Sequence, residues 1–376
     1  MREGRSLIEP LETEVPMRFS RAAEVKDWKS EKYFEPKRAD LIDRFAQFAV
    51  VAAREAIQGA ALDSSDFGDG RTGVIMGTSA GGQRTQDEQL RRLYADGART
   101  MHPLSIPRSM ANGGASAIAT DTGIRGPAFA VATACASSNH AIALALILLR
   151  SGVVDRVIAG GSESFFTRGF LSAWEALRVV SPDTCRPFSA NRKGLILGEG
   201  AGVLVLEKSD VARARGARVF GELAGFGMSS DASHITKPTV EGPAQAMRDA
   251  LTDAQLNPEQ IGYINAHGTG TLVNDPIECR AIREVFGDHA DRLAISSTKS
   301  MHGHALGASG ALEAIATVLA LKKGVLPPTA NFTERDPDCD LDVIPNEARE
   351  VTVQAAISNA FAFGGLNAVL AFRGVS

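Results

Sequence analysis

The sequence is poor in cysteine, has no long apolar run and carries little net charge. Its four cysteines among 376 residues are scattered and form no CxxC pair, which is typical of free thiols in a reduced, cytoplasmic protein. The longest apolar run, Ala141–Leu149, has nine residues, whereas a membrane-spanning helix needs about 20, so we expect a buried helix there. A net charge of −4 gives no general basic field for nucleic acid. No secretory signal peptide is recognisable at Met1.

Glycine is plentiful, and the apolar segments alternate between extended and helical patterns. The 37 glycines lie largely between apolar segments, as expected where the backbone turns sharply or approaches a ligand. Strands that alternate with helices predict a mostly parallel α/β architecture, in two domains or one large fused core. The predicted helices span residues 39–60, 137–150, 243–255, 275–286 and 306–323, and the predicted strands span residues 73–77, 129–134, 154–161, 201–207, 219–227, 261–266, 293–297, 355–359 and 368–373.

Cys135 lies where a predicted strand gives way to a predicted helix. Small residues surround it in the run 129–140, and the apolar helix begins directly after them. A strand that delivers a thiol to a helix N-terminus can present a nucleophile, because the helix dipole and the unpaired first-turn amides favour a thiolate. A lone cysteine before an apolar helix is equally compatible with a small buried hydrophobe, so the interpretation depends on catalytic partners.

Three further segments carry candidate partners, and each follows a predicted strand. They are the loop 265–271 with His267, the segment 297–308 with Lys299, His302 and His304, and the glycine-rich bend 359–367. Taken alone, the His-Gly-His pair is compatible with a metal site, although zinc usually has three or four ligands at recognisable spacing, and the bend is compatible with a plain turn. Because loops after strand C-termini gather ligand chemistry in α/β folds, the segments together predict one active site.

Six short motifs run in order along nearly the whole chain. They are Thr133-Ala-Cys-Ala, Arg186-Pro-Phe, Gly198-Glu-Gly-Ala-Gly, Asn265-Ala-His-Gly-Thr-Gly-Thr, Ser297-Thr-Lys-Ser-Met-x-Gly-His and Phe361-Ala-Phe-Gly-Gly. This combination resembles the β-ketoacyl-[acyl-carrier-protein] synthases of the type I/II class, and the stretches 174–194 and 300–304 are most similar to the nodulation protein E branch. The resemblance implies a thiolase-like fold of two similar α/β halves in a layered α-β-α-β-α arrangement. Residues 1–218 would carry the nucleophilic cysteine, and residues 219–376 would carry two catalytic histidines.

The resemblance implies a decarboxylative Claisen condensation in fatty-acid or specialised lipid biosynthesis. Cys135 would take an acyl group from a carrier-protein thioester, and malonyl-carrier protein would then lose CO2 and attack it. His267 and His304 would stabilise the enolate as Nε2–H donors. The backbone amides of Cys135 and Phe363 would form the oxyanion hole.

The resemblance also assigns supporting residues. Lys299 would hold or tune the histidine region and pair with Glu313, whereas His302 falls at a non-catalytic motif position and is interpreted as local packing. The remaining matches are the gate Phe363, the substrate-binding residues Thr269, Thr271, Phe361 and Met110, of which Met110 would line the acyl tunnel, and the structural acids Asp275 and Glu278.

The implied partner is an acyl carrier protein, and the implied assembly is a cytoplasmic homodimer, with peripheral inner-membrane association in the nodulation branch. The carrier protein is acidic in this family, so a local basic patch is expected. Lys37 and Arg38 lie at matching positions with Arg44 nearby, although a solvated helix end explains them equally well. No cofactor and no metal are expected, because phosphopantetheine arrives on the carrier protein.

The sequence departs from the family at three places. Leu195 replaces an aromatic residue near the pocket and Leu366 replaces a common threonine, which affects substrate shape more than reaction type. Family members also open with a strand and a helix, and Met1–Ser6 resembles only the end of that helix. Because the strand is expected at the centre of the first half-sheet, its loss would expose backbone groups, and we expect the chain to be poorly soluble alone.

Other functions use some of the same residues. A cysteine hydrolase would need Cys135 and one histidine, but neither the second histidine nor the lysine. A non-catalytic partner subunit of a condensing heterodimer would lack the cysteine, and a thiolase or type III synthase would show Cys-His-Cys or Cys-His-Asn instead. Within the condensing enzymes, housekeeping fatty-acid elongation competes with a specialised role. The nodulation-like stretch favours the specialised role, with an unusual acyl chain.

Overall fold

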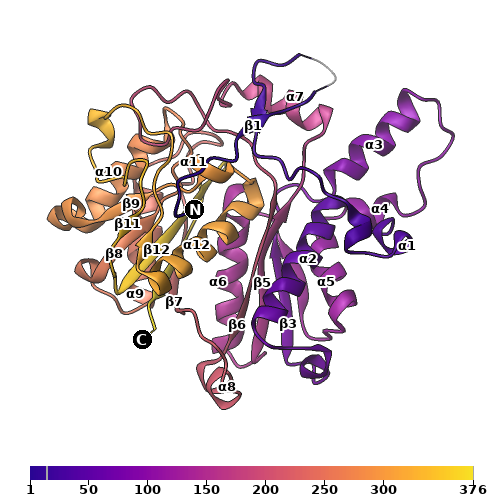
Figure 1. The fold of residues 1–376 in the computed structure, drawn as a ribbon, viewed down its shortest axis with the longest axis horizontal. Helices are drawn as coiled ribbons and strands as arrows, with labels where there is room; N and C mark the ends of the chain where they lie inside the picture. The colour runs from indigo at the N-terminus through magenta and orange to yellow at the C-terminus, as the bar shows by residue number, and fades with distance from the viewer. Residues whose placement is uncertain (14–15, 376) are drawn as a thin grey trace.

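Two β-sheets form the framework of the protein, for which a computed structural model describes residues 1–13 and 16–375 (Figure 1). The first sheet has the strand order β4-β3-β5-β6, and the second has the order β7-β13-β12-β8-β9. Each sheet is parallel except for one reversed strand, β6 in the first and β13 in the second. The strands are β3 (Thr72–Gly77), β4 (Ala128–Val131), β5 (Arg156–Glu163), β6 (Gly200–Glu207), β7 (Glu222–Ser230), β8 (Ile261–Asn265), β9 (Ala294–Ser296), β12 (Ala355–Ala362) and β13 (Leu366–Arg373).

Helices cover both faces of each sheet, so that helices and sheets together form five layers. Figure 1 shows α6 and α12 between the sheets, α2 and α5 outside the first sheet, and α9 and α10 outside the second. The helices of these layers are α2 (Arg44–Gly59), α5 (Gly113–Thr122), α6 (Ser137–Arg150), α9 (Glu241–Asp253), α10 (Asn274–Phe286) and α12 (Ser309–Lys323). The arrangement is the layered α-β-α-β-α fold that the sequence predicts.

The middle layer joins the two halves through one apolar core. Ile75 of β3, Ala141 of α6, Tyr263 of β8 and Ala314 of α12 all lie in a single buried cluster. Because β3 and β5 are buried along their full length, their apolar side chains pack against helices on both faces, as expected for the parallel part of a sheet. Cys135 lies just before α6 and His304 just before α12, so the two central helices begin at the same region.

The N-terminal segment departs from the prediction. Met1–Ser6 forms no helix; instead the hydroxyl of Ser6 donates to Ser300 O at 3.2 Å, and Leu7 N–H donates to Met301 O at 2.8 Å. The expected absence of a first strand stays a prediction, but its expected central position is wrong, because the described strands β4, β3, β5 and β6 pair without a gap. In the second sheet, the reversed β13 lies between β12 and the edge strand β7.

Short elements and two further helices connect this framework. The sequence pattern did not single out α3 (Gln83–Tyr94) or α7 (Arg168–Leu177). The remaining strands and α-helices are β1 (Glu9–Pro10), β2 (Arg21–Ala22), α1 (Pro36–Ala39), α4 (Ser105–Ser109), α8 (Ser209–Ala214), α11 (Lys299–His302), β10 (Val325–Leu326) and β11 (Arg349–Glu350). Across the described residues, no helix has the length and apolarity needed to cross a membrane.

Candidate active site

Cys135 lies in a short 3-10 turn, Ala134–Ala136, between β4 and α6. Ala134 has φ 48°, a left-handed conformation that costs a residue with a Cβ about 1–2 kcal/mol. The hydroxyl of Ser137 holds the turn, because it donates to Ala134 O at 2.7 Å and accepts from Thr133 N–H at 2.9 Å. Strand, turn and helix therefore present the thiol in the predicted order.

His304 reaches the same thiol from the second half. Its Nε2 lies 3.0 Å from the Cys135 sulfur, and its Nδ1 lies 2.8 Å from the hydroxyl of Ser309, the first residue of α12. Leu306, two residues after His304, has φ 44°. Strained residues such as Ala134 and Leu306 persist only where the surrounding structure holds them, and here they flank the two groups that meet.

His267 follows β8 and completes a buried group of three. Its ring meets that of His304 edge to face, with the ring centroids 5.4 Å apart. The sulfur of Cys135 and the ring nitrogens of the two histidines lie within 4.8 Å of one another. The three residues are only 7%, 3% and 1% exposed for Cys135, His267 and His304. Their reactive atoms are therefore close together and shielded from bulk water.

A buried ion pair lies behind His267. The ammonium of Lys299 pairs with Oε1 of Glu313, and neither side chain is exposed. The same ammonium donates to His267 O at 2.6 Å and lies 3.3 Å from His267 Nδ1. Because an ammonium group has only donors, Nδ1 is the acceptor and the ring proton of neutral His267 lies on Nε2.

Burial sets the protonation states at the site. Burial raises the pKa of the Cys135 thiol to about 12, against the opposing effects of the Lys299 charge and the Phe363 N–H. Burial and the charge of Lys299 hold the pKa values of His267 and His304 well below 6.5. Burial therefore opposes the helix-stabilised thiolate that the sequence leads us to expect and favours the neutral forms of the thiol and of both imidazoles.

Asp275 and Glu278 on α10 hold the loop that carries His267. Glu278 accepts hydrogen bonds from the N–H groups of His267 and Gly268, each at 2.8 Å. Asp275 accepts from Gly270 N–H at 3.2 Å, and burial raises its pKa to about 6. Both carboxyl groups are fully buried and bind backbone, which places them at supporting positions rather than at the thiol.

Thr269 and Thr271 lie on the same loop, with their hydroxyl oxygens 2.9 Å apart. Arg192 supports this loop: it is 5% exposed, donates to Thr271 O at 3.0 Å and pairs with Asp336. The two predicted pantetheine-binding hydroxyls are therefore held in a fixed position relative to His267.

The bend after β12 approaches the thiol from a third side. The N–H of Phe363 lies within hydrogen-bonding reach of the Cys135 sulfur and lowers the pKa of that thiol. The Phe363 ring stacks on Trp174, with centroids 6.2 Å apart and planes 24° apart, while the Phe361 ring packs on His267 at 5.9 Å. The predicted oxyanion donor thus lies at the nucleophile, and its ring contacts an aromatic residue that the motifs did not identify.

Apolar side chains surround Cys135. The buried cluster that contains it comprises Phe19, Phe165, Leu171, Trp174, Leu195, Leu197 and Leu306. Leu195, which replaces a family aromatic, therefore lies in the wall beside the thiol. A wall of this composition suits the alkyl part of a substrate.

Two predicted residues lie apart from this group. Met110 is 47% exposed at the C-terminal end of α4, so it lines no buried tunnel within this chain. His302 lies in α11, where its Nε2 is 3.0 Å from the hydroxyl of Thr298. This local contact agrees with the interpretation of His302 as loop packing.

The three basic residues predicted to dock the carrier protein differ in their exposure and in their ion pairs. Lys37 is exposed on α1, whereas Arg38, with 40% of its side chain exposed, pairs with Asp121. The assignment of Arg44 as a docking cation is wrong, because its side chain is only 15% exposed and it pairs with Glu199 at 2.7 Å. Arg44 therefore holds the interior of the first half together.

Within the described residues, only Cys135, His267 and His304 are grouped as metal ligands would be. Cysteine and histidine are ligands that zinc prefers. However, the ammonium of Lys299 lies 3.3 Å from His267 Nδ1, so it fixes a proton on the other nitrogen and adds a positive charge. The group is better suited to an anion than to a cation.

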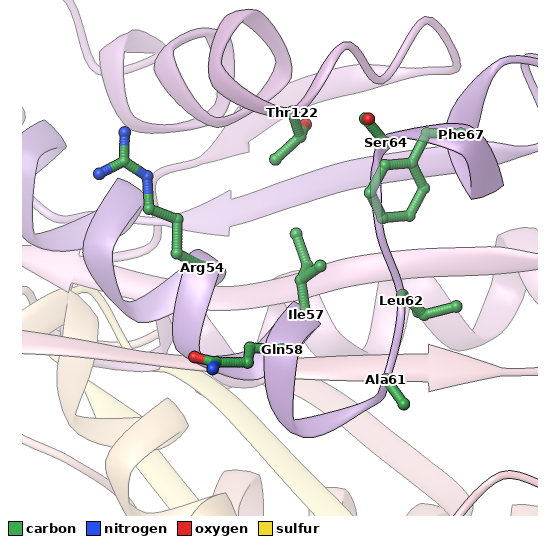
Figure 2. A pocket seen from close by; sticks show the side chains of 8 residues that line it. All are labelled: Arg54, Ile57, Gln58, Ala61, Leu62, Ser64, Phe67 and Thr122. Atoms are coloured by element: carbon green, nitrogen blue, oxygen red, sulfur yellow. The ribbon is translucent and has the colours of Figure 1, made fainter.

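A surface hollow of about 440 Å³ lies between the C-terminal ends of α2 and α5 (Figure 2). Its charged lining side chain, Arg54, pairs with Asp121 through two hydrogen bonds, at 2.6 and 2.7 Å. The other lining residues are Ile57, Gln58, Ala61, Leu62, Ser64, Phe67 and Thr122. The hollow contains none of the residues at the thiol and gives no argument about function.

Two buried polar residues near the thiol were missed by the sequence reasoning. Ser309 contacts His304, and Glu163 ends β5 with no exposed surface. An acid at the end of the otherwise apolar run 156–163 is a signal that could have drawn attention to Glu163. Ser309 offers no such signal, because a serine at the start of a helix is common as a cap.

Known proteins resemble this chain over both halves. Residues 9–212 match the beta-ketoacyl synthase N-terminal domain and residues 220–333 match the beta-ketoacyl synthase C-terminal domain. The chain is 50% identical over 377 residues to nodulation protein E of Rhizobium sp. (strain N33), covering 100% of this chain and 94% of that protein. It is 40% identical over 377 residues to 3-oxoacyl-[acyl-carrier-protein] synthase 2 of Staphylococcus aureus (strain N315), covering 98% and 91% of the two chains.

A solved structure shares the fold. A ketosynthase in complex with its type II PKS acyl-carrier protein superposes with a TM-score of 0.91 and 32% sequence identity, over 100% of this chain and 93% of that chain. The family models, the relatives and the solved structure all point to the same family. The chain therefore belongs to the beta-ketoacyl synthase family of condensing acyltransferases.

Proposed function

We propose that Cys135 carries the acyl group that this β-ketoacyl synthase extends. In the first half-reaction its sulfur attacks the thioester of an acyl-carrier protein. A new carbon–sulfur bond forms, the old one breaks, and the thiol proton ends on the released carrier-protein thiol. The 3.0 Å contact between His304 Nε2 and the Cys135 sulfur carries this proposal, because it places a polar partner directly at the nucleophile.

In the second half-reaction, malonyl-carrier protein loses CO2, and the electrons of the broken carbon–carbon bond form an enolate. His267 and His304 donate from Nε2–H to the enolate oxygen. Lys299 supports this role for His267, because its ammonium donates to Nδ1 and so leaves the ring proton on Nε2. The carbanion attacks the acyl-Cys135 thioester, Cys135 N–H and Phe363 N–H hold the oxyanion, and the thiolate leaves and takes a proton from water.

The residues at the site supply this chemistry without a resident cofactor or metal. Charge stabilisation comes from imidazole and backbone donors, and the flexible phosphopantetheine arm arrives with the carrier protein. The hydroxyls of Thr269 and Thr271, 2.9 Å apart, would bond that arm. Dialysis against EDTA tests this point: full activity is expected afterwards, and a loss that zinc or magnesium restores would contradict it.

We propose a specialised lipid as the product class, with an unusual acyl chain. Two observations support it: the 50% identity to nodulation protein E and the presence of Leu195 in the apolar wall beside Cys135. The competing role is housekeeping elongation, which the 40% identity to the Staphylococcus synthase 2 favours. Competition between carrier proteins loaded with saturated and with polyunsaturated acyl chains separates the two, since equal use of the two kinds of chain would favour housekeeping.

The proposed partner is an acyl carrier protein, and the proposed assembly is a homodimer. β4 is an outer strand of its sheet, and Phe129 on it is 37% exposed, so its edge can pair with a second copy. Light scattering tests this: a dimer is expected at micromolar concentration, Phe129→Lys should shift it towards monomer, and a monomeric parent protein would contradict it.

We place the protein in the cytoplasm with peripheral association at the inner membrane. Cell fractionation tests this, and exclusive recovery in a salt-washed soluble fraction would remove the membrane association.

Intact-mass measurement of acyl transfer tests the central proposal. The protein is incubated with acyl-carrier proteins of varied chain length, and the acyl adduct is quantified. One acyl group per chain is expected, and Cys135→Ala should abolish it. An adduct that persists in that variant would overturn the assignment.

A further inference from the structure

Glu163 joins two other segments of the chain to the end of its own strand. It ends β5, has no exposed surface and lies close enough to Cys135 for its charge to raise the pKa of that thiol. The loop 78–82, which follows the neighbouring strand β3, surrounds its carboxylate. The hydroxyls of Thr78 and Ser79 donate at 3.0 and 2.6 Å, and the N–H groups of Ser79 and Ala80 donate at 2.7 and 3.3 Å.

A fifth donor comes from the other half of the protein. The N–H of Gly307 donates to Glu163 at 3.0 Å, and Gly307 lies in the turn between His304 and α12. The carbonyl of the same residue accepts from the hydroxyl of Ser138, three residues after Cys135. The Gly307 peptide is therefore held from both sides, by Glu163 and by the helix that begins at the nucleophile.

The close packing at this point requires glycine at two positions. A Cβ at Gly307 would lie 2.4 Å from Ser79 N and 2.6 Å from the Glu163 carboxylate. A Cβ at Gly161 would lie 2.0 Å from the Ser138 hydroxyl oxygen and 2.8 Å from Gly307 O. Leu306 beside it keeps its left-handed φ of 44°, a conformation that needs support from its neighbours.

We propose that Glu163 is a positioning residue, which holds the His304-bearing turn of the second half against the Cys135-bearing turn of the first. The inference rests on the proposed roles of Cys135 and His304. A carboxylate is suited to the task because it has only acceptor sites, and all five groups that converge on Glu163 are donors. Substitution by glutamine keeps the shape but replaces one acceptor oxygen by an NH2 group, which faces at least one backbone N–H in either orientation of the amide.

The position of Glu163 separates this role from a purely electrostatic one. Its negative charge raises the pKa of the Cys135 thiol, so loss of the charge alone would make the thiol more reactive. Loss of positioning would instead lengthen the 3.0 Å contact between His304 and Cys135 and slow the reaction. The two roles therefore predict opposite changes in turnover for Glu163→Gln.

The test compares Glu163→Gln and Glu163→Asp with a matched control. Glu207→Gln serves as the control, because Glu207 is a largely buried carboxylate on β6 of the same sheet, paired with Arg156 and Arg215 rather than with the site. Condensation kcat per titrated active site, KM for acyl-carrier protein and the melting temperature are measured for each. We expect kcat to fall roughly 100-fold in Glu163→Gln with KM within about threefold, a smaller fall in the charged but shorter Glu163→Asp, and parental kcat in Glu207→Gln.

A parental or higher kcat in Glu163→Gln would overturn the proposal, as would equal losses in Glu163→Gln and Glu207→Gln. If Glu163→Gln does not fold, Thr78→Val removes one of the five donors and decides instead: a lower kcat at unchanged KM supports the proposal, and an unchanged kcat refutes it. Cys135→Ala is measured alongside. An acyl adduct in Cys135→Ala would refute the proposed nucleophile whatever the Glu163 variants do, so the two ideas fail separately.

Discussion

The ammonium of Lys299 lies 3.3 Å from Nδ1 of His267, in a place where neither side chain meets water. This contact fixes the tautomer of the imidazole and so decides which nitrogen can donate to a substrate anion. The positive charge of Lys299 is neutralised by an ion pair with the carboxylate of Glu313. The reacting atoms therefore depend on a buried ion pair that does not itself touch substrate.

Lys299→Met should slow decarboxylation more than acylation. Without the ammonium, His267 is free to carry its proton on Nδ1 and then offers no donor to the enolate, and the loss of one such donor costs roughly 100- to 1,000-fold in rate. Release of CO2 from malonyl-carrier protein and formation of the acyl adduct on Cys135 are measured separately. Equal losses in the two steps would contradict the tautomer role and indicate general collapse of the site.

The burial of Glu313 should make the folded protein progressively less stable as the pH rises from about 4.5 to about 7. Burial raises its folded pKa to about 7 from 4.5, so the unfolded chain ionises first as pH rises. Protonated Glu313 therefore stabilises the folded protein fully below about pH 4.5. This stabilisation, about 3 kcal/mol, is lost as the pH rises through about 7. Urea unfolding across this range should show that difference between the parent and Glu313→Gln. Parallel curves for the two proteins would contradict it.

The thiol of Cys135 should react faster with rising pH and show no plateau near neutrality. Because burial raises its pKa to about 12, the thiolate fraction increases about tenfold per pH unit between pH 7 and 9. Alkylation by iodoacetamide, read by peptide mass at Cys135, should follow that slope, with Cys135→Ser as the control. A rate that levels off by pH 8 would reveal a preformed thiolate–imidazolium pair.

Local sequence determines the long elements here, and tertiary packing determines the protonation states. The helix predicted over 137–150 matches α6 to the residue, because small polar residues give way to an unbroken apolar run. The polar α3 was missed, since only Thr85 and Gln89 on it are buried and no apolar stripe marks it. The burial of Cys135 could not be predicted locally, because it comes from Leu195, Trp174 and other residues that are remote in sequence.

The same reasoning explains which parts of the site were found. His267, Lys299 and His304 could be identified because each lies in a motif of fixed spacing. Trp174 and Ser309 could not, because their contacts with Phe363 and His304 join segments whose side chains meet only in the folded chain. Arg44 was misassigned because a charge near a helix start looks the same in sequence whether it meets solvent or a buried Glu199.

Trp174→Phe should widen the range of acyl chains that Cys135 accepts. Trp174 is 7% exposed, lies in the apolar cluster beside the thiol and stacks on Phe363, so the smaller ring frees space and loosens the gate. Adduct formation from competing chain lengths should shift towards longer or bulkier chains by a few-fold, with Phe67→Leu, in a separate buried cluster of the first half, as a packing control. An unchanged preference would show that the ring does not bound the pocket.

Lys37→Glu should raise KM for the carrier protein and leave reactions with small thioesters unchanged. Lys37 is exposed and forms no ion pair within the described residues, whereas Arg38 already pairs with Asp121, so Lys37 is the cleaner probe of a docking charge. Reversal of one rim charge mainly slows association and weakens at higher salt, so an increase of about 3- to 10-fold at low salt should shrink at 0.5 M. Lys323→Glu is the matched control, because this exposed lysine lies at the far end of α12, a full helix length from His304. Equal KM values for the two reversed variants would place carrier docking elsewhere on the surface.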